Sequence, residues 1–201
     1  IIRRKNPDLS FGICMNPEFL REGRAVEDFL HPDRIVVGSS DPKTIRIMHE
    51  LYTGIAAPII DVDPTAAEMI KYTSNALLAT KISFANEIGN LCKQLGVNVY
   101  EVMAGVGMDS RVSPKFLNAG CGFGGSCFPK DVSALASIAR EHGVTPTLLN
   151  AVLAVNDSQP LRMVELLETR IGSLSGKRFA VLGLAFKSNT DDVRESRSRL
   201  G

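Results

Sequence analysis

The sequence predicts a mostly α-helical central domain built on one long helix, with partial α/β structure on either side of it. Three observations support this class. Beyond Asp63-Pro64 the chain runs for about thirty residues to Gly96 without a proline, and Gly89 is its first glycine. Short β-branched runs precede this segment, and one more follows near the end of the sequence. A helix far longer than the average of roughly 11–12 residues often links domains or forms the seam of a dimer.

The composition is that of an ordinary globular protein with an apolar core. Of 201 residues, 44% are hydrophobic and 22% are charged, and the formal net charge is +1. No basic block indicates a nucleic-acid surface, no apolar run reaches the roughly 18–20 residues that span a bilayer, and the N-terminus lacks the order of a signal peptide. Widely spaced cysteines and histidines predict a cytoplasmic protein with reduced thiols and without a metal site. These residues are Cys14, Cys92, Cys121 and Cys127, and His31, His49 and His142.

Residues 1–62 are expected to form α/β structure. The β-branched runs Arg34–Gly38 and Pro58–Val62 are bounded by proline, glycine or aspartate, which indicates strands. The shorter apolar run Phe11–Met15 also has the pattern of a strand and ends at an Asn-Pro turn signal.

Helices are expected at five places, most of them begun by an Asp-Pro pair or a proline, or ended by a glycine. The helix expected at residues 146–171 contains Pro160, which should kink or split it. Residues 105–125 hold six glycines and should form a long loop, of the kind that is usually functional. Arg178–Gly183 has the pattern of a buried strand. The expected helices cover residues 42–52, 64–95, 99–104, 129–142 and 146–171.

Cys127 has the surroundings of a nucleophile. It follows Gly124-Gly125-Ser126, so backbone and substrate can approach closely. It also precedes a predicted helix with Pro129 in the first turn, and the positive end of the helix dipole favours a thiolate. Lys130 adds positive charge, and Asp131 could orient water or the lysine. The alternative is a buried cysteine behind an ordinary loop.

Two further pairs of polar residues could take part in chemistry. Lys71 and Asn75 share a face of the long helix, and a cation with an amide donor could stabilise a developing oxyanion. The alternative is a Glu68–Lys71 surface ion pair with an exposed Asn75. Glu18 and Glu22 follow a predicted strand and would share a face if helical. They could then serve as a general base and a hydroxyl-binding group, or they could be solvated surface charges.

The glycines of residues 120–125 match the G-x-G-x-x-G spacing of dinucleotide-binding loops, but we reject that interpretation. The motif needs a strand directly before it within a βαβ unit, whereas Pro114–Ala119 predicts a loop or a short helix. The glycines are expected to shape a substrate loop instead. Val181–Phe186 does follow a predicted strand, but Ala185 stands where a second glycine is needed.

Five motifs occur in one order along residues 11–198. They are Asn16–Gly23, Glu68–Asn75, Phe84–Gly89, Gly122–Asp131 and Gly183–Ser196. Together they resemble the UDP-glucose/GDP-mannose 6-dehydrogenase family, and the loop at 107–120 is most similar to its UDP-glucose branch. GDP-mannose remains the alternative substrate.

The resemblance implies an NAD-dependent four-electron oxidation of a nucleotide sugar. The C6 alcohol becomes an aldehyde, Cys127 adds to give a thiohemiacetal, a second hydride transfer leaves a thioester, and water releases the uronate. Lys71 and Asn75 would stabilise oxyanions and touch the sugar. Asp131 would assist proton transfer and water activation, and Glu18 would support the hydrolytic water.

The resemblance also implies binding residues. Glu22 would lie near the nicotinamide, and Lys130 and Arg194 near the NAD phosphates or ribose. Arg111 would reach into the neighbouring subunit's site, which implies a homodimer through the long helix 64–95. Contacts with the nucleotide sugar are implied for Phe19, Leu20, Arg111, Phe116, Leu117, Phe123, Gly124 and Lys187.

The motif order implies three parts. Residues 1–62 would be the last strands of an NAD-binding Rossmann-like domain. Residues 63–172 would be a helical central dimerisation domain with the cysteine loop, and residues 173–201 the start of a nucleotide-sugar-binding Rossmann-like domain. The strand–G-x-G-x-x-G–helix segment that opens the family's fold is not among these residues, so we expect a fragment that does not turn over by itself.

Three other interpretations stay open at this point. One is a helical dimerisation module without activity, which the long helix also predicts. The second is a cysteine hydrolase, which would need a histidine base near the thiol. The third is a hydroxyacid dehydrogenase, which would not need Cys127.

Overall fold

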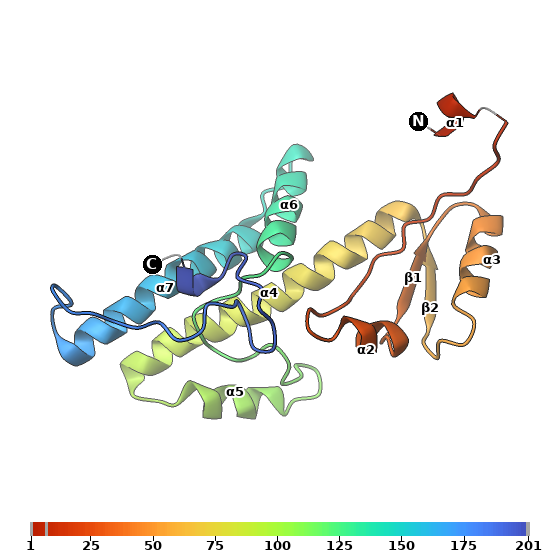
Figure 1. Ribbon diagram of the computed structural model, residues 1–201. Coiled ribbons are helices and arrows are strands. Elements are labelled where there is room, and N and C mark those ends of the chain that lie inside the picture. The colour runs from red at the N-terminus through yellow and green to blue at the C-terminus, as the bar shows by residue number, and fades with distance from the viewer. Residues whose placement is uncertain (1, 7, 200–201) are drawn as a thin grey trace. The chain divides into compact units, whose positions relative to one another are not determined.

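The computed structural model describes residues 2–6 and 8–199 and divides the chain into two compact units, the first up to Lys71 and the second from Tyr72. Figure 1 shows mostly helices, one of them very long, and a small sheet of short strands, which is the predicted class. Within the described residues, no helix combines the length and the apolar character that crossing a membrane requires.

The first unit contains a small parallel sheet. Its strands β1 (Ile35–Gly38) and β2 (Ile59–Val62) pair with Ile35 opposite Ile59, and the helix α3 (Pro42–Leu51) connects them. All four residues of β1 are buried. Helix α3 begins as predicted, because the Asp41 carboxylate accepts hydrogen bonds from two backbone N–H groups of its first turn. The shorter helices are α1 (Ile2–Lys5) and α2 (Ala25–Leu30).

The second unit is built along the helix α4 (Pro64–Leu95), which begins in the first unit. Ala76 and Ala79 on α4 are buried together with Phe123, Val132 and Val152. The alanines are small, so the neighbouring helices can pack closely against α4 in this core. The other elements are α5 (Val99–Gly107), α6 (Phe128–Glu141), α7 (Thr147–Ile171) and the 3-10 helix η1 (Arg197–Arg199).

Two predicted strands are not found in the described chain. Residues 178–183 have no regular structure there, because a strand needs a neighbour to satisfy its backbone groups; Leu182 remains 93% exposed. Of Phe11–Met15, only Met15 pairs, in an isolated antiparallel bridge with Gly38. Both segments are apolar enough for a strand, but within the described residues they lack a partner along their length.

Two helices extend further than the sequence predicted or continue where a break was possible. Helix α5 continues to Gly107 rather than ending at residue 104, so the glycine-rich loop begins later. Helix α7 passes Pro160 without splitting, although proline lacks the N–H that the Asn156 carbonyl would otherwise accept from. Val152, Asn156 and Gln159 of α7 are buried, and this packing offsets the lost helical hydrogen bond.

Candidate active site

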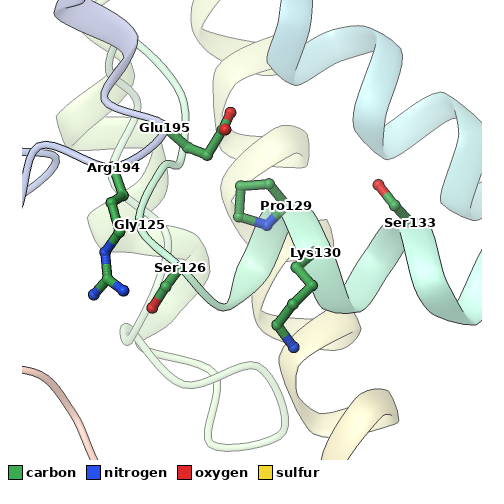
Figure 2. A pocket seen from close by; sticks show the side chains of 7 residues that line it. All are labelled: Gly125, Ser126, Pro129, Lys130, Ser133, Arg194 and Glu195. Carbon is green, nitrogen blue, oxygen red and sulfur yellow. The ribbon is translucent and has the colours of Figure 1, made fainter.

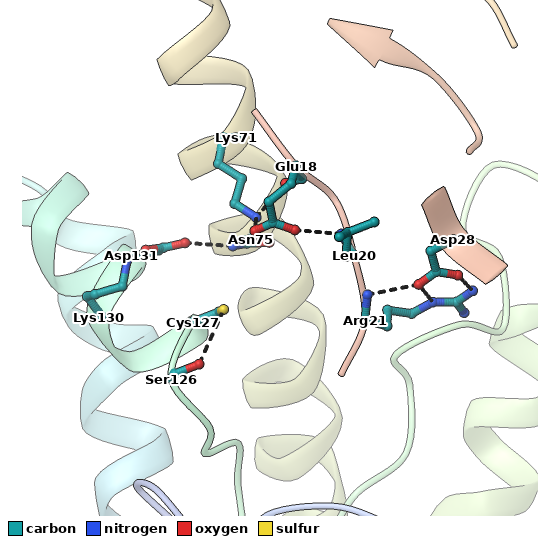
Figure 3. Close-up of polar contacts among 10 residues, drawn as sticks. All are labelled: Glu18, Leu20, Arg21, Asp28, Lys71, Asn75, Ser126, Cys127, Lys130 and Asp131. Carbon is teal, nitrogen blue, oxygen red and sulfur yellow. Dashed lines mark hydrogen bonds and ion pairs between the residues drawn. The ribbon is translucent and has the colours of Figure 1, made fainter. Parts of the chain in front are cut away.

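Cys127 lies at the N-terminus of α6, where the Ser126 hydroxyl is 3.7 Å from its sulfur (Figure 3). The thiol belongs to an exposed residue, which rules out the alternative of a buried cysteine. The turn before it depends on Gly125, whose φ is 79° and whose missing side chain would collide with the ring of Phe186. The sulfur therefore remains open to a substrate at the positive end of a 14-residue helix.

A buried carboxylate, Asp131, lies one helical turn after Cys127. Its side chain is 3% exposed. Asn75 Nδ2 donates to one carboxylate oxygen at 2.6 Å, and Lys130 forms an ion pair with the other. Asn75 is itself only 9% exposed, so the alternative of an exposed amide is wrong. The hydrogen bond with Asp131 raises the pKa of Lys130, whose ammonium lies 5.9 Å from the centre of the Tyr72 ring.

In the first unit, Lys71 binds Glu18 rather than Glu68. The Lys71 ammonium donates to the Glu18 carboxylate at 2.7 Å and to the Glu18 backbone carbonyl at 2.6 Å. It also lies 5.7 Å from the centre of the Phe19 ring, over which the Arg34 guanidinium lies at 3.9 Å. The predicted alternative of a Glu68–Lys71 surface pair is therefore wrong.

The condition under which Glu18 and Glu22 would share a face, a helix over these residues, is not met. In the described chain, residues 16–23 are irregular apart from a turn that begins at Glu22. Asn16 holds this segment through distant contacts: its amide donates to a carbonyl of β1 at 2.7 Å and accepts from the Tyr52 hydroxyl at 2.5 Å. The Asn16 side chain therefore ties the start of this irregular segment to β1 and to Tyr52.

A pocket of about 490 Å³ lies beside the N-terminus of α6 (Figure 2). Lys130 and Arg194, both expected to contact the cofactor, line it together, and Arg194 also pairs with Asp192 at 2.7 Å. Two cations near the N–H groups of a helix terminus fit the phosphates of a dinucleotide. The lining residues are Gly125, Ser126, Pro129, Lys130, Ser133, Arg194 and Glu195.

The remaining expected contact residues lie in different surroundings. Leu117 and Phe123 are buried in two separate core clusters, so their side chains pack inside the protein. Phe116 has a φ of 65° and its ring lies against that of Phe128. Arg111 is 87% exposed and pairs with Asp109 at 2.6 Å. Their roles toward a ligand stay predictions.

Three buried amides were not expected from the sequence. Asn86, Asn156 and Gln159 are at most 1% exposed, and all three bond to the glycine-rich loop. A signal for two of them exists, because Asn156 and Gln159 lie three residues apart in an apolar helical stretch and so share a face. Buried amides are expected only where they find hydrogen-bond partners.

Comparison with known proteins gives two family matches. The central domain of the UDP-glucose/GDP-mannose dehydrogenase family matches residues 65–158, and the NAD binding domain of that family matches residues 1–56. The chain is 51% identical to the UDP-glucose 6-dehydrogenase AglM of Haloferax volcanii over 193 residues, which are 94% of this chain and 45% of that protein. It is 50% identical to the UDP-glucose 6-dehydrogenase TuaD of Bacillus subtilis, over 93% of this chain and 41% of that protein.

A solved structure agrees with these matches. The UDP-glucose dehydrogenase from Pyrobaculum islandicum superposes with a TM-score of 0.95 at 48% identity, over 98% of this chain and 46% of that chain. The chain thus spans less than half the length of the relatives it matches. The central-domain match covers the helix with Lys71 and Asn75 as well as the loop and helix with Cys127 and Asp131. The chain belongs to the UDP-glucose/GDP-mannose dehydrogenase family.

Proposed function

We propose that the protein containing these residues oxidises the C6 alcohol of UDP-glucose to the carboxylate of UDP-glucuronate, with NAD as electron acceptor. The exposed thiol of Cys127, one helical turn from a buried Asp131 that Asn75 and Lys130 hold, carries the proposal. Two relatives named UDP-glucose 6-dehydrogenase, at 51% and 50% identity, support the choice of substrate.

This oxidation needs a nucleophile that keeps the aldehyde bound between two steps. NAD, when bound, accepts one hydride in each step. After the first step, the Cys127 sulfur adds to the aldehyde carbon and forms a thiohemiacetal, and loss of the remaining hydride from that carbon leaves a thioester. Water then attacks the thioester carbonyl and the thiolate leaves. The free thiol that this cycle needs persists in a reducing compartment, and we place the protein in the cytoplasm.

We assign the proton transfers to Asp131, because its carboxylate is shielded from water and held in one orientation by its two partners. Lys71 and Asn75, one turn apart on α4, are assigned to the oxyanion that forms at C6. Glu18 is assigned to the hydrolytic water. Each assignment follows the family motif and the hydrogen-bonding capacity of the side chain.

The pocket beside α6 is assigned to the cofactor. Its two cationic side chains, Lys130 and Arg194, would hold the NAD phosphates at the helix N-terminus. Glu22 is assigned to the neighbourhood of the nicotinamide. The backbone of Gly124 is assigned to the sugar-nucleotide loop, because a side chain there would collide with the Glu195 carbonyl.

We also propose a homodimer through α4. Leu77, Phe84 and Leu91 recur every seven residues on this helix and are 61%, 51% and 54% exposed. A second copy would remove this apolar stripe from water, and the exposed Arg111 would reach the neighbouring site. Light scattering should show a dimer, and a monomer at high protein concentration would refute this part of the proposal.

The reaction is tested on the full-length gene product with NAD and UDP-glucose. We expect two NADH for each UDP-glucuronate, and Cys127→Ser should stop release of the uronate. Cys121→Ser is the matched control, because Cys121 is a second exposed thiol in the same loop, and it should remain active. Strong preference for GDP-mannose would overturn the substrate, and absence of NADH with either sugar would overturn the function.

A further inference from the structure

The backbone of Phe123 is held by two side chains that lie far from it in the sequence. The Asn156 amide forms a closed pair with it: Oδ1 accepts from the Phe123 N–H at 2.7 Å, and Nδ2 donates to the Phe123 carbonyl at 3.1 Å. Arg197 Nε donates to the same carbonyl at 2.9 Å, and its guanidinium also pairs with Asp157 at 3.0 Å. Asn156 is 0% exposed and the Arg197 side chain 8%, so bulk water competes little with either bond.

Gly120 is held in the same manner. Its N–H donates to Asn86 Oδ1 at 2.7 Å, and its carbonyl accepts from Gln159 Nε2 at 3.1 Å. Side-chain amides therefore satisfy the loop backbone at two points three residues apart, as a neighbouring strand does in a sheet. Gly122 lies between these points with a φ of 104°, and a Cβ there would lie 2.6 Å from Asn156 Oδ1.

Two aromatic rings connect the backbone held at Phe123 to the residues beside the cysteine. The rings of Phe123 and Phe128 meet edge to face, with centroids 6.0 Å apart and planes at 84°. These residues stand on either side of Cys127, and Phe123 is 4% exposed within the core. Between them, the Gly125 N–H donates to the Arg194 carbonyl at 2.9 Å. The short segment with the sulfur is therefore closed at both ends, and its position depends on the backbone of Phe123.

We infer that Asn156 and Arg197 are positioning residues that set the place of the Cys127 sulfur through the backbone of Phe123. The inference rests on the proposed role of Cys127 as nucleophile. Misplacing a reacting group by about 1 Å can cost about 10²-fold in rate. The loss should therefore be larger in kcat than any change in the KM values for UDP-glucose and NAD.

The main test compares Asn156→Asp and Arg197→Gln with the unaltered full-length gene product. Asn156→Asp keeps the size of the side chain and its acceptor but removes the donor to the Phe123 carbonyl. Arg197→Gln removes the guanidinium, and Arg197→Lys asks whether charge alone suffices. We expect faster amide hydrogen exchange confined to residues 120–127, and a fall in kcat of about 10²-fold for Asn156→Asp. Arg197→Lys should not keep the kcat of the unaltered protein, because an ammonium cannot reproduce the planar contact of the guanidinium.

Ser83→Ala is the matched control. The Ser83 hydroxyl donates to the Val152 carbonyl at 2.9 Å, so the substitution removes a buried α4–α7 hydrogen bond and leaves the loop untouched. It should lower Tm without changing kcat or the exchange of residues 120–127. If Asn156→Asp instead raises exchange equally in α4, α6 and α7, or leaves kcat unchanged, the inference is overturned.

Failure of the proposed function would look different. In that case the unaltered protein forms no NADH, yet alkylation still reports on the loop. A change in the alkylation rate of Cys127 in Asn156→Asp, together with exchange confined to residues 120–127, would support the positioning role alone. An unchanged alkylation rate of Cys127 would overturn it.

Discussion

Two carboxylate–lysine pairs, one in each unit, differ in which partner is shielded from water. In the first unit the Glu18 side chain is 54% exposed, while that of Lys71 is 16% exposed. In the second unit the Asp131 side chain is 3% exposed, while that of Lys130 is 66% exposed. One pair therefore shields its cation and the other its anion.

This difference suits the two pairs to different tasks. A buried carboxylate is tolerated only with fixed partners, and Asp131 has both Asn75 and Lys130. Such a group can transfer a proton in one defined direction. An exposed carboxylate such as Glu18 remains in contact with water, which suits a group that orients a hydrolytic water molecule.

The largest expected effect comes from the shielded anion. Asp131→Asn replaces the carboxylate by an amide of nearly the same size, so proton transfer is lost and kcat should fall about 10²–10⁴-fold. NADH formation by the full-length gene product measures this loss. Glu141→Gln, at an exposed carboxylate of the same helix, is the control and should leave kcat unchanged. A variant within about tenfold of the unaltered rate would show that Asp131 is not the acid–base group.

A smaller effect is expected from the exposed anion. Glu18→Gln removes a charge that orients water, and a hydrogen bond to a charged group is worth about 1.5–3 kcal/mol, or at least about tenfold in rate. If the role is confined to hydrolysis, the first turnover should stay fast and the thioester on Cys127 should accumulate. Rapid mixing would then show a burst of NADH, and mass spectrometry would find the adduct. A uniformly slower reaction without a burst would contradict the assignment.

Local signals predicted most helices because caps and breakers act within a few residues. Pro64 and Gly96 bound the long helix as expected, and Asp41 caps α3. The spacing that places Asp131 one turn after Cys127 is local in the same sense. These features can be predicted from neighbouring residues alone.

Features that depend on distant partners were not predictable in this way. The conformation around Glu18, left open by the sequence, is irregular, and Asn16 in this segment contacts Tyr52, 36 residues away. The pairing of Asn156 with Phe123 joins residues 33 apart, and the burial of Asp131 depends on Asn75, 56 residues away. Hydrophobic pattern and spacing report on one element at a time, so they cannot show which elements meet.

A third ion pair, between Arg21 and Asp28, also leaves its cation more exposed than its anion, at 54% against 11%. Arg21 pairs with Asp28 at 2.5 Å, and the hydrogen bond from Arg21 lowers the pKa of Asp28 from 3.8 to about 2. The folded pKa lies below the unfolded value, so the pair stabilises the fold above about pH 4 and this stabilisation is lost as the pH falls through about 2. Because Arg21 is 54% exposed, solvent screening limits the contribution to about 1 kcal/mol.

Arg21→Met tests this smallest effect. Urea unfolding should show a free energy of unfolding about 1 kcal/mol lower than that of the unaltered protein near pH 7, and a vanishing difference near pH 2. A difference that persists at the lower pH would mean that the arginine stabilises by packing its stem rather than by its charge. In that case the exposure of the charged groups would not predict how much each ion pair of this chain contributes to stability. The different roles proposed for Glu18 and Asp131 would then have to be explained by their hydrogen-bond partners.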